Sequence, residues 1–141
     1  MSLTATARSI PGTLRQDVLI DGRHLLTTDE PEHLGGDGTA PAPHELFPAA
    51  LAACVSTTLV MYARTKDWDL GEVTVAVDYD HRAEPRRVDV DIHLTGDLED
   101  WQLERLERVA ARCPLRRSID AGFTFVERLE SRRPTLAGAV A

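Results

Sequence analysis

The sequence predicts an α+β fold in which helices pack on one face of an antiparallel sheet. Three observations predict it. Apolar residues recur at three- and four-residue spacing from His44 to Thr65, which is the period of a helix with one buried stripe, and Cys54 lies on that stripe. Apolar and polar residues then alternate over 72–81 and again over 88–94, as in two half-buried strands of a hairpin. A second helical period follows over 101–113, and Asp97 or Asp100 is expected to cap it.

The remaining segments complete a single domain over 1–141. Residues 14–20 and 24–28 flank the turn Asp21-Gly22-Arg23 and predict an N-terminal hairpin. The proline- and glycine-rich stretch 29–43 has no periodicity and is expected to be a loop. The aromatic side chains of Phe123 and Phe125, followed by Leu129, suggest a last strand. The unpatterned tail 132–141 is expected to fray.

Charge and hydropathy exclude several classes of function. The formal net charge of -7 would repel a phosphate backbone and an anionic bilayer, so nucleic acid is not an expected partner. The longest apolar run, 46–55, is about half of the roughly 20 residues that a membrane helix needs. The N-terminus lacks the pattern of a signal peptide. We therefore expect a cytoplasmic protein without a membrane association, in which a purely structural disulfide is disfavoured.

The two cysteines are the main candidates for chemistry. Free cysteines are commonly small buried hydrophobes, and this interpretation stays open for both. If the pair is reactive, position favours Cys54 as the attacking thiol, because Cys113 directly precedes Pro114 at the expected C-terminal end of a helix, where a thiolate is disfavoured. Cys54 lies deep in its own helix and would need a nearby Arg or His to activate it. The five histidines and two cysteines form no metal-binding motif, and no nucleotide-binding or hydrolase motif is present.

Several motifs, taken in order, resemble the OsmC/Ohr family. They are Asp29-Glu-Pro31, Gly35-Gly36, the stretch from Pro41 to Cys54, and Cys113-Pro114. Segments such as 57–63 and 66–68 look like the general OsmC-like branch of that family. The resemblance implies an OsmC-like fold: antiparallel sheets, a long central cysteine-bearing helix, a second helix, and an intertwined homodimer with active sites at the subunit interface. It also implies a thiol-dependent peroxidase of the oxidative stress response, acting on organic hydroperoxides without a metal or organic cofactor.

Carried onto this chain, the resemblance assigns a role to each cysteine. Cys54 resembles the peroxidatic cysteine, which becomes a sulfenic acid. Cys113 resembles the resolving cysteine, which closes an intramolecular disulfide. A dithiol reductant, in the family a lipoylated protein or a small thiol, would then restore both.

The family also uses a glutamate before the cysteine helix and an N-terminal arginine. Glu45 is the candidate acid, although in the hydroperoxidase branch this position is one residue earlier, where His44 stands here. A continuous helix would place Glu45 about 13.5 Å from Cys54, so the acid would act across a dimer interface unless Pro48 breaks the helix start. A structural role at the helix N-terminus is an equal alternative. Arg23 is the preferred arginine, with Arg8 and Arg15 as the other candidates.

Two further functions stay open. A non-catalytic dimer of the same fold could bind a small apolar ligand, and a redox-sensing or disulfide-regulating protein could use the same cysteine pair. Positions expected to form an apolar wall near the thiols, and equally compatible with plain core, are Phe47, Leu51, Met61 and Trp101.

Overall fold

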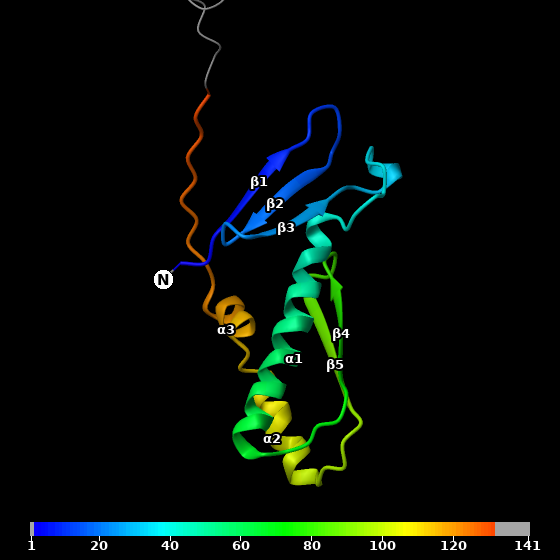
Figure 1. Ribbon diagram of the computed structural model, residues 1–141, viewed down its shortest axis with the longest axis vertical. Helices are drawn as coiled ribbons and strands as arrows, with labels where there is room; N and C mark the ends of the chain where they lie inside the picture. The colour runs from blue at the N-terminus through cyan, green and yellow to red at the C-terminus, as the bar shows by residue number, and fades with distance from the viewer. Residues whose placement is uncertain (1, 132–141) are drawn as a thin grey trace, which may run out of the picture.

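The computed structural model describes residues 2–131 and combines an N-terminal sheet, a long helix, a hairpin and two shorter helices (Figure 1). The α+β architecture with antiparallel sheets is as the sequence predicts. In chain order the elements are β1 (Ala5–Ser9), β2 (Gln16–Ile20), β3 (His24–Thr28), the short 3-10 turns η1 (Glu32–Leu34) and η2 (Pro43–Glu45), α1 (Leu46–Lys66), β4 (Val73–Asp80), β5 (Arg87–Leu94), α2 (Asp100–Ala110) and α3 (Pro114–Ala121).

The N-terminal sheet has the order β1-β2-β3 and stands beyond the start of α1, at one end of the elongated molecule (Figure 1). The predicted hairpin is confirmed as β2 and β3. Asp21 and Gly22 both have positive φ angles, of 52° and 64°, which suits the twist of a tight hairpin turn. The sequence did not reveal β1, and all five of its residues are exposed. Leu25 on β3 is 66% exposed, so within one chain this sheet has almost no core.

The predicted loop after β3 is confirmed and is organised by Asp29. This carboxylate is fully buried. It accepts hydrogen bonds from the backbone amides of Glu30, Asp37 and Thr39 and from the Thr39 hydroxyl, at 2.8 to 3.3 Å. The bonds from Thr39 are the main reason that the pKa of Asp29 lies below its ordinary value. The loop is thereby held in one conformation ahead of α1.

Helix α1 forms the axis of the molecule. Pro48 lies in its first turn, where a missing amide hydrogen costs no intrahelical bond. Its buried stripe is Leu51, Val55, Leu59 and Ala63, which belongs to one core cluster with Leu70, Leu106, Ala110 and Cys113. By length and composition alone, the helical stretch Pro43–Lys66 could cross a membrane. Within the described residues 22% of the apolar window is buried, and this part is the stripe that packs in the core cluster.

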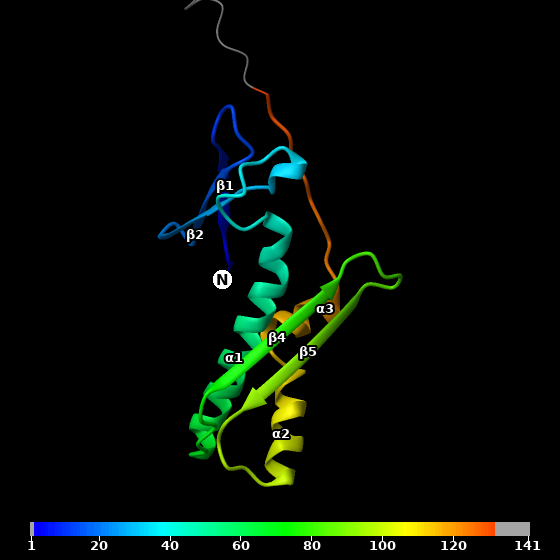
Figure 2. The same cartoon turned by 90° about the vertical axis from the view of Figure 1, so that its right-hand side faces the viewer.

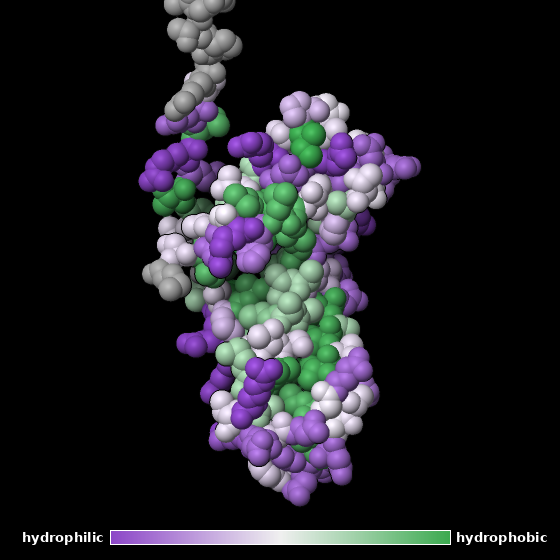
Figure 3. Space-filling view, viewed as in Figure 1, coloured by the Kyte–Doolittle hydropathy of each residue, from purple (hydrophilic) through white to green (hydrophobic). Residues whose placement is uncertain are grey.

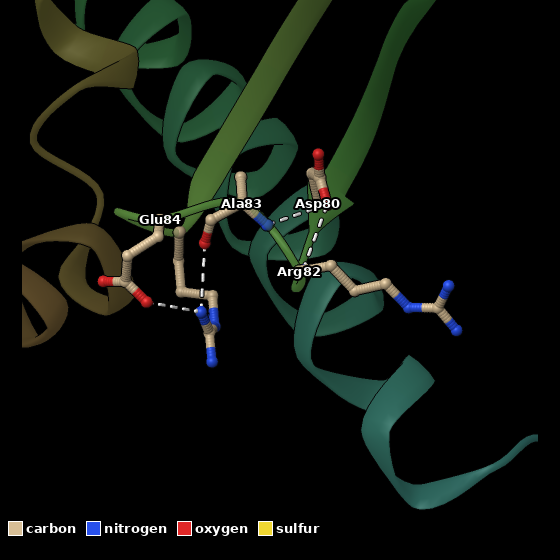
Figure 4. Close-up of polar contacts among 5 residues, drawn as sticks. Asp80, Arg82, Ala83 and Glu84 are labelled. Atoms are coloured by element: carbon tan, nitrogen blue, oxygen red, sulfur yellow. Dashed lines mark hydrogen bonds and ion pairs between the residues drawn. The ribbon is translucent and has the colours of Figure 1, made fainter.

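Strands β4 and β5 form the predicted hairpin, with Val75 opposite Ile92 and Val77 opposite Val90. Helices α1, α2 and α3 all lie behind one face of this hairpin (Figure 2). The turn between the strands is tied by Asp80, which accepts hydrogen bonds from the backbone amides of Arg82 and Ala83 at 3.1 Å (Figure 4). The side chain of Arg86 bridges the Ala83 carbonyl and the Glu84 carboxylate on the other side of the turn.

Two expectations about the second helical region are wrong. The residue that caps α2 is Glu99, whose backbone amide donates to the Gln102 side chain at 2.8 Å, and not Asp97 or Asp100. The helix ends at Ala110, so Cys113 is not its last residue. Pro114 instead begins α3, because proline fits the first position of a helix as well as it ends one.

The expected last strand is also wrong. Residues 122–131 follow α3 as an extended segment without regular secondary structure (Figure 1). The side chains of Phe123, Phe125 and Leu129 are 63%, 78% and 97% exposed. Alternation alone cannot form a strand when the described chain offers no partner strand beside it. The predicted frayed tail, 132–141, lies outside the described residues.

Candidate functional site

Cys54 lies in the middle of α1, eight residues after the helix begins, and is half-buried. Its position therefore gives it little help from the helix dipole, which acts mainly in the first turn. Thr58, one turn further along, donates a hydrogen bond from its hydroxyl to the Cys54 carbonyl at 2.7 Å. The thiol packs at the edge of the core cluster, where it keeps access to solvent.

Cys113 lies in the short connection between α2 and α3 and is fully buried. It is the N-terminal cap of α3, and its sulfur accepts a hydrogen bond from the backbone amide of Arg116 at 3.3 Å. The expectation that Cys113 meets the negative end of a helix is therefore wrong. Its sulfur meets the positive end of α3 instead, where a thiolate is favoured.

The fold brings the two thiols together. Burial is the largest cause that raises the pKa of Cys113 above its ordinary value, and the neighbouring Cys54 thiol raises it further. The hydrogen bond from the Arg116 amide opposes this shift without cancelling it. Both cysteines are free thiols. The pairing of a half-buried thiol with a fully buried one is the central feature of the site.

Glu45 lies at the start of α1 and points back along the chain. Its carboxylate accepts a hydrogen bond from the backbone amide of Ala42 at 3.2 Å, as a capping residue does. Turn η2 runs into α1 without a break, so nine residues of helical chain separate Glu45 from Cys54, about 13.5 Å along the axis. Within one chain the structure therefore does not bring Glu45 to the thiols.

The three candidate arginines all lie on or beside the N-terminal sheet. Arg23 forms an ion pair with Asp21 at 2.7 Å in the β2–β3 turn, with 70% of its side chain exposed. Arg15 differs, because its Nε is buried and has no hydrogen-bond partner within the described part of the chain. An unpaired buried guanidinium nitrogen is costly, so Arg15 carries a buried donor that the described single chain leaves unsatisfied.

Only two of the four residues expected to form an apolar wall line a cavity in the structure. Phe47 and Leu51 line a cavity of about 370 Å³ between α1, β5, α2 and α3, together with valines and an isoleucine of β5. Met61 and Trp101 do not line it and are 61% and 57% exposed. Trp101 packs edge-on against Trp68, with 5.5 Å between the ring centroids. The cavity is mostly apolar, but neither cysteine lines it.

A second cavity, of about 380 Å³, lies between α1 and α2. Its lining is Thr58 and Tyr62 of α1, Arg105, Arg108 and Val109 of α2, and Arg112 just after α2. The three- and four-residue spacing of the arginines within the predicted helical region 101–113 is the sequence signal for this cluster. Among residues 2–131, no group of three or more His, Cys, Asp or Glu side chains is placed to hold a metal ion.

Comparison with known proteins identifies the family. A model of the OsmC-like protein family matches residues 36–127. A search of curated proteins found no match.

Solved structures share the fold over most of their length. A protein from Psychrobacter arcticus, described as an osmotic stress induced and detoxification response protein, is 27% identical, with a TM-score of 0.69 over 83% of this chain and 87% of that one. An organic hydroperoxide resistance protein OsmC from Legionella pneumophila is 28% identical, with a TM-score of 0.59 over 84% and 89%. A protein from Vibrio cholerae described as an organic hydroperoxide resistance protein, with captopril bound in one of the active sites, is 28% identical, with a TM-score of 0.59 over 83% of each chain. On the family match and these shared folds, the chain belongs to the OsmC-like protein family.

Proposed function

We propose that this protein is a thiol-dependent peroxidase that reduces organic hydroperoxides, with Cys54 attacking and Cys113 resolving. The observation that carries the proposal is the packing of two free thiols that differ in burial within one core cluster. Membership of a family whose relatives include organic hydroperoxide resistance proteins supports the choice of substrate. In a reducing compartment such as the cytoplasm, which we expect from the sequence, the pair would rest in the dithiol form.

The reaction balances in three steps. The Cys54 thiolate attacks the terminal oxygen of the hydroperoxide, the O–O bond breaks, and the leaving alkoxide takes a proton to become an alcohol, while Cys54 is oxidised to a sulfenic acid. The Cys113 thiol gives up its proton, its sulfur bonds to the Cys54 sulfur, and water leaves. An external dithiol then reduces the disulfide by two exchanges and becomes a disulfide itself.

The difference between the thiols supports this order of attack. A peroxide reaches a half-buried sulfur more easily than a fully buried one, and Cys113 is the fully buried member. Burial raises the pKa of Cys113, which makes it a poorer attacking thiol than an accessible one. The Arg116 amide at the start of α3 then stabilises the charge that develops on Cys113 as it attacks.

Turnover with a dithiol tests the proposal. Purified protein is mixed with cumene hydroperoxide and dithiothreitol, and peroxide consumption is followed. We expect catalytic consumption by the native protein, none above background for Cys54→Ser, and strongly slowed turnover for Cys113→Ser. Consumption by Cys54→Ser at the native rate, or none by the native protein at any dithiol concentration, would overturn the assignment.

We further propose that the working unit is an intertwined homodimer. The N-terminal sheet has almost no core of its own, the extended segment 122–131 has no partner strand, and apolar surface spreads over the α1 side of the molecule (Figure 3). Small side chains on the exposed face of α1, among them Ala49, Ala53 and Thr57, would let a second α1 approach closely. A second subunit could also supply a hydrogen-bond partner for the buried Arg15 Nε, which has none in the described single chain. It could bring its Glu45 near the thiol pair, because Glu45 does not reach the thiols of its own chain.

The apolar cavity favours a second candidate function, the binding of a small apolar ligand. Its volume of about 370 Å³ is within the range of ligand pockets, and Phe47, Leu51 and the β5 side chains make its wall. Ligand binding without chemistry would leave both thiols unchanged by hydroperoxide. The turnover experiment therefore separates the two candidates.

A further inference from the structure

An arginine-lined groove lies between α1 and α2. The cavity of about 380 Å³ has Thr58 and Tyr62 on its α1 side, and Arg105, Arg108 and Arg112 on its α2 side. Arg105 and Arg108 lie on one face of α2, three residues apart, and Arg112 follows in the turn after the end of the helix. We call this cavity, with its three arginines, the arginine groove.

Among residues 2–131, the arginines of this groove form no ion pair with a carboxylate. Within the described residues, the ion pairs join other side chains: Arg23 with Asp21, Arg86 with Glu84, Arg87 with Asp89, and Arg116 with Asp120. Arg105 instead donates from its Nε to the Tyr62 hydroxyl at 2.9 Å, which holds its guanidinium at the groove. Glu107 of the same helix lines the apolar cavity and not the groove. A chain with a net charge of -7 thus gathers three unpaired positive charges in one hollow.

One end of the arginine groove adjoins the thiols. Thr58 is one turn after Cys54 on α1 and is bonded to the Cys54 carbonyl. Arg112 directly precedes Cys113 in the chain. Neither cysteine lines the groove, but its Thr58 end is one helical turn from Cys54, so a molecule that extends past this end would approach the Cys54 thiol.

We propose that the arginine groove binds the anionic group, a carboxylate or a phosphate, of a molecule whose other end reacts at Cys54. The inference rests on the proposed function and adds to it the charge of the reacting molecule. Guanidinium groups pair with carboxylates and phosphates through two parallel hydrogen bonds, and these are strong when no internal carboxylate competes. Two molecules reach the thiols in the reaction cycle, the hydroperoxide and the reductant, and the anion can belong to either.

Binding of a redox-inert probe tests the groove independently of catalysis. Calorimetry compares octanoate with octanamide, which has a similar chain without the charge. We expect octanoate to bind at least about tenfold more tightly, to lose that advantage at high salt, and to lose it in the double variant Arg108→Gln/Arg112→Gln. Arg82→Gln is the matched control, because its side chain points away from the β4–β5 turn into solvent (Figure 4). Equal binding of the two probes, or an advantage that persists in the double variant, would overturn the proposal.

Two matched pairs then identify the source of the anion. A fatty acid hydroperoxide is compared with its methyl ester, and dihydrolipoate is compared with dihydrolipoamide as reductant. We expect KM for the charged member of one pair to be about tenfold lower in the native protein and in Arg82→Gln, and this difference to vanish in Arg108→Gln/Arg112→Gln. Turnover without a charge preference in either pair would overturn the link between groove and thiols. Absence of all turnover would refute the peroxidase function, while the octanoate comparison would still decide whether the groove binds anions.

Discussion

Cys54 and Cys113 are 59 residues apart in the sequence and neighbours in the folded chain, where the Cys54 thiol raises the pKa of the buried Cys113 thiol. Two elements bring them together. Helix α1 carries Cys54 at the edge of its buried stripe, and the connection between α2 and α3 carries Cys113 into the same core cluster. The core of the molecule and its candidate chemistry are therefore built from the same packing.

The raised pKa of Cys113 predicts a pH dependence of stability. An unfolded cysteine ionises near pH 8.5, whereas the folded Cys113 stays protonated to higher pH. Above about pH 8.5 the unfolded state therefore gains stability first, and the free energy of unfolding of the reduced protein falls as pH rises towards the folded pKa. Chemical denaturation under a phosphine reductant from pH 7 to 10 measures it, with Cys113→Ser as the reference. Parallel curves for the two proteins would contradict the burial of a protonated thiol.

The lowered pKa of Asp29 predicts that the stability of the fold depends on pH in the acid range. This lowered pKa means that the folded carboxylate stays ionised where the unfolded one takes up a proton. Its contribution is fully present above about pH 4 and is lost as pH falls through the folded pKa. We expect Asp29→Asn to lower the melting temperature at pH 7 and to flatten the loss of stability between pH 4 and 2. Asp37→Asn, an exposed change in the same loop, is the control and should leave both unchanged.

Truncation of Leu59 measures how much the core contributes to the free energy of unfolding. Leu59 is fully buried at the centre of the α1 stripe, so Leu59→Ala removes buried methyl groups and leaves a cavity. The expected loss in the free energy of unfolding is about 2 to 5 kcal/mol. Glu104→Ala, an exposed change on α2, should remain within about 0.5 kcal/mol. Urea denaturation measures both, and a Leu59→Ala protein as stable as Glu104→Ala would refute the packing described.

Substitution of Ala53 tests the proposed homodimer. Ala53 lies on the exposed face of α1, so a large charged side chain there would prevent a second α1 from packing closely. We expect light scattering to give a dimer for the native protein and a monomer for Ala53→Arg. Thr74→Arg, on the exposed face of β4, should remain dimeric. A monomeric native protein would refute the homodimer.

Much of the fold could be predicted from periodicity. The α1 stripe and the alternation in β4 and β5 each report a face that is buried within the chain. Strand β1 could not be predicted from the sequence. All its residues are exposed in the single chain, so no buried face imposes an alternation of apolar and polar residues on it. Helix α3 could not be predicted because proline occurs both just after the end of a helix and at the start of one, so Pro114 does not show which it marks.

The candidate site was only partly predictable for a different reason. The resemblance to a family selected Cys54 and Cys113, and the fold brings them together. Periodicity says nothing about which charges lack a partner, and this is what distinguishes Arg15 from Arg23 and the arginines of α2 from the paired ones. Such information exists only once side chains are placed in space.

If hydroperoxide links Cys54 to Cys113 through a sulfenic acid, peptide mass mapping detects both the disulfide and the sulfenic acid. Reduced protein receives one equivalent of cumene hydroperoxide, is alkylated, and is digested for peptide mapping. We expect a single disulfide between the Cys54 and Cys113 peptides in the native protein, and in Cys113→Ser a sulfenic acid on Cys54 that dimedone traps. Two alkylated, unoxidised thiols in the native protein, or oxidation of Cys113 with Cys54 intact, would contradict it.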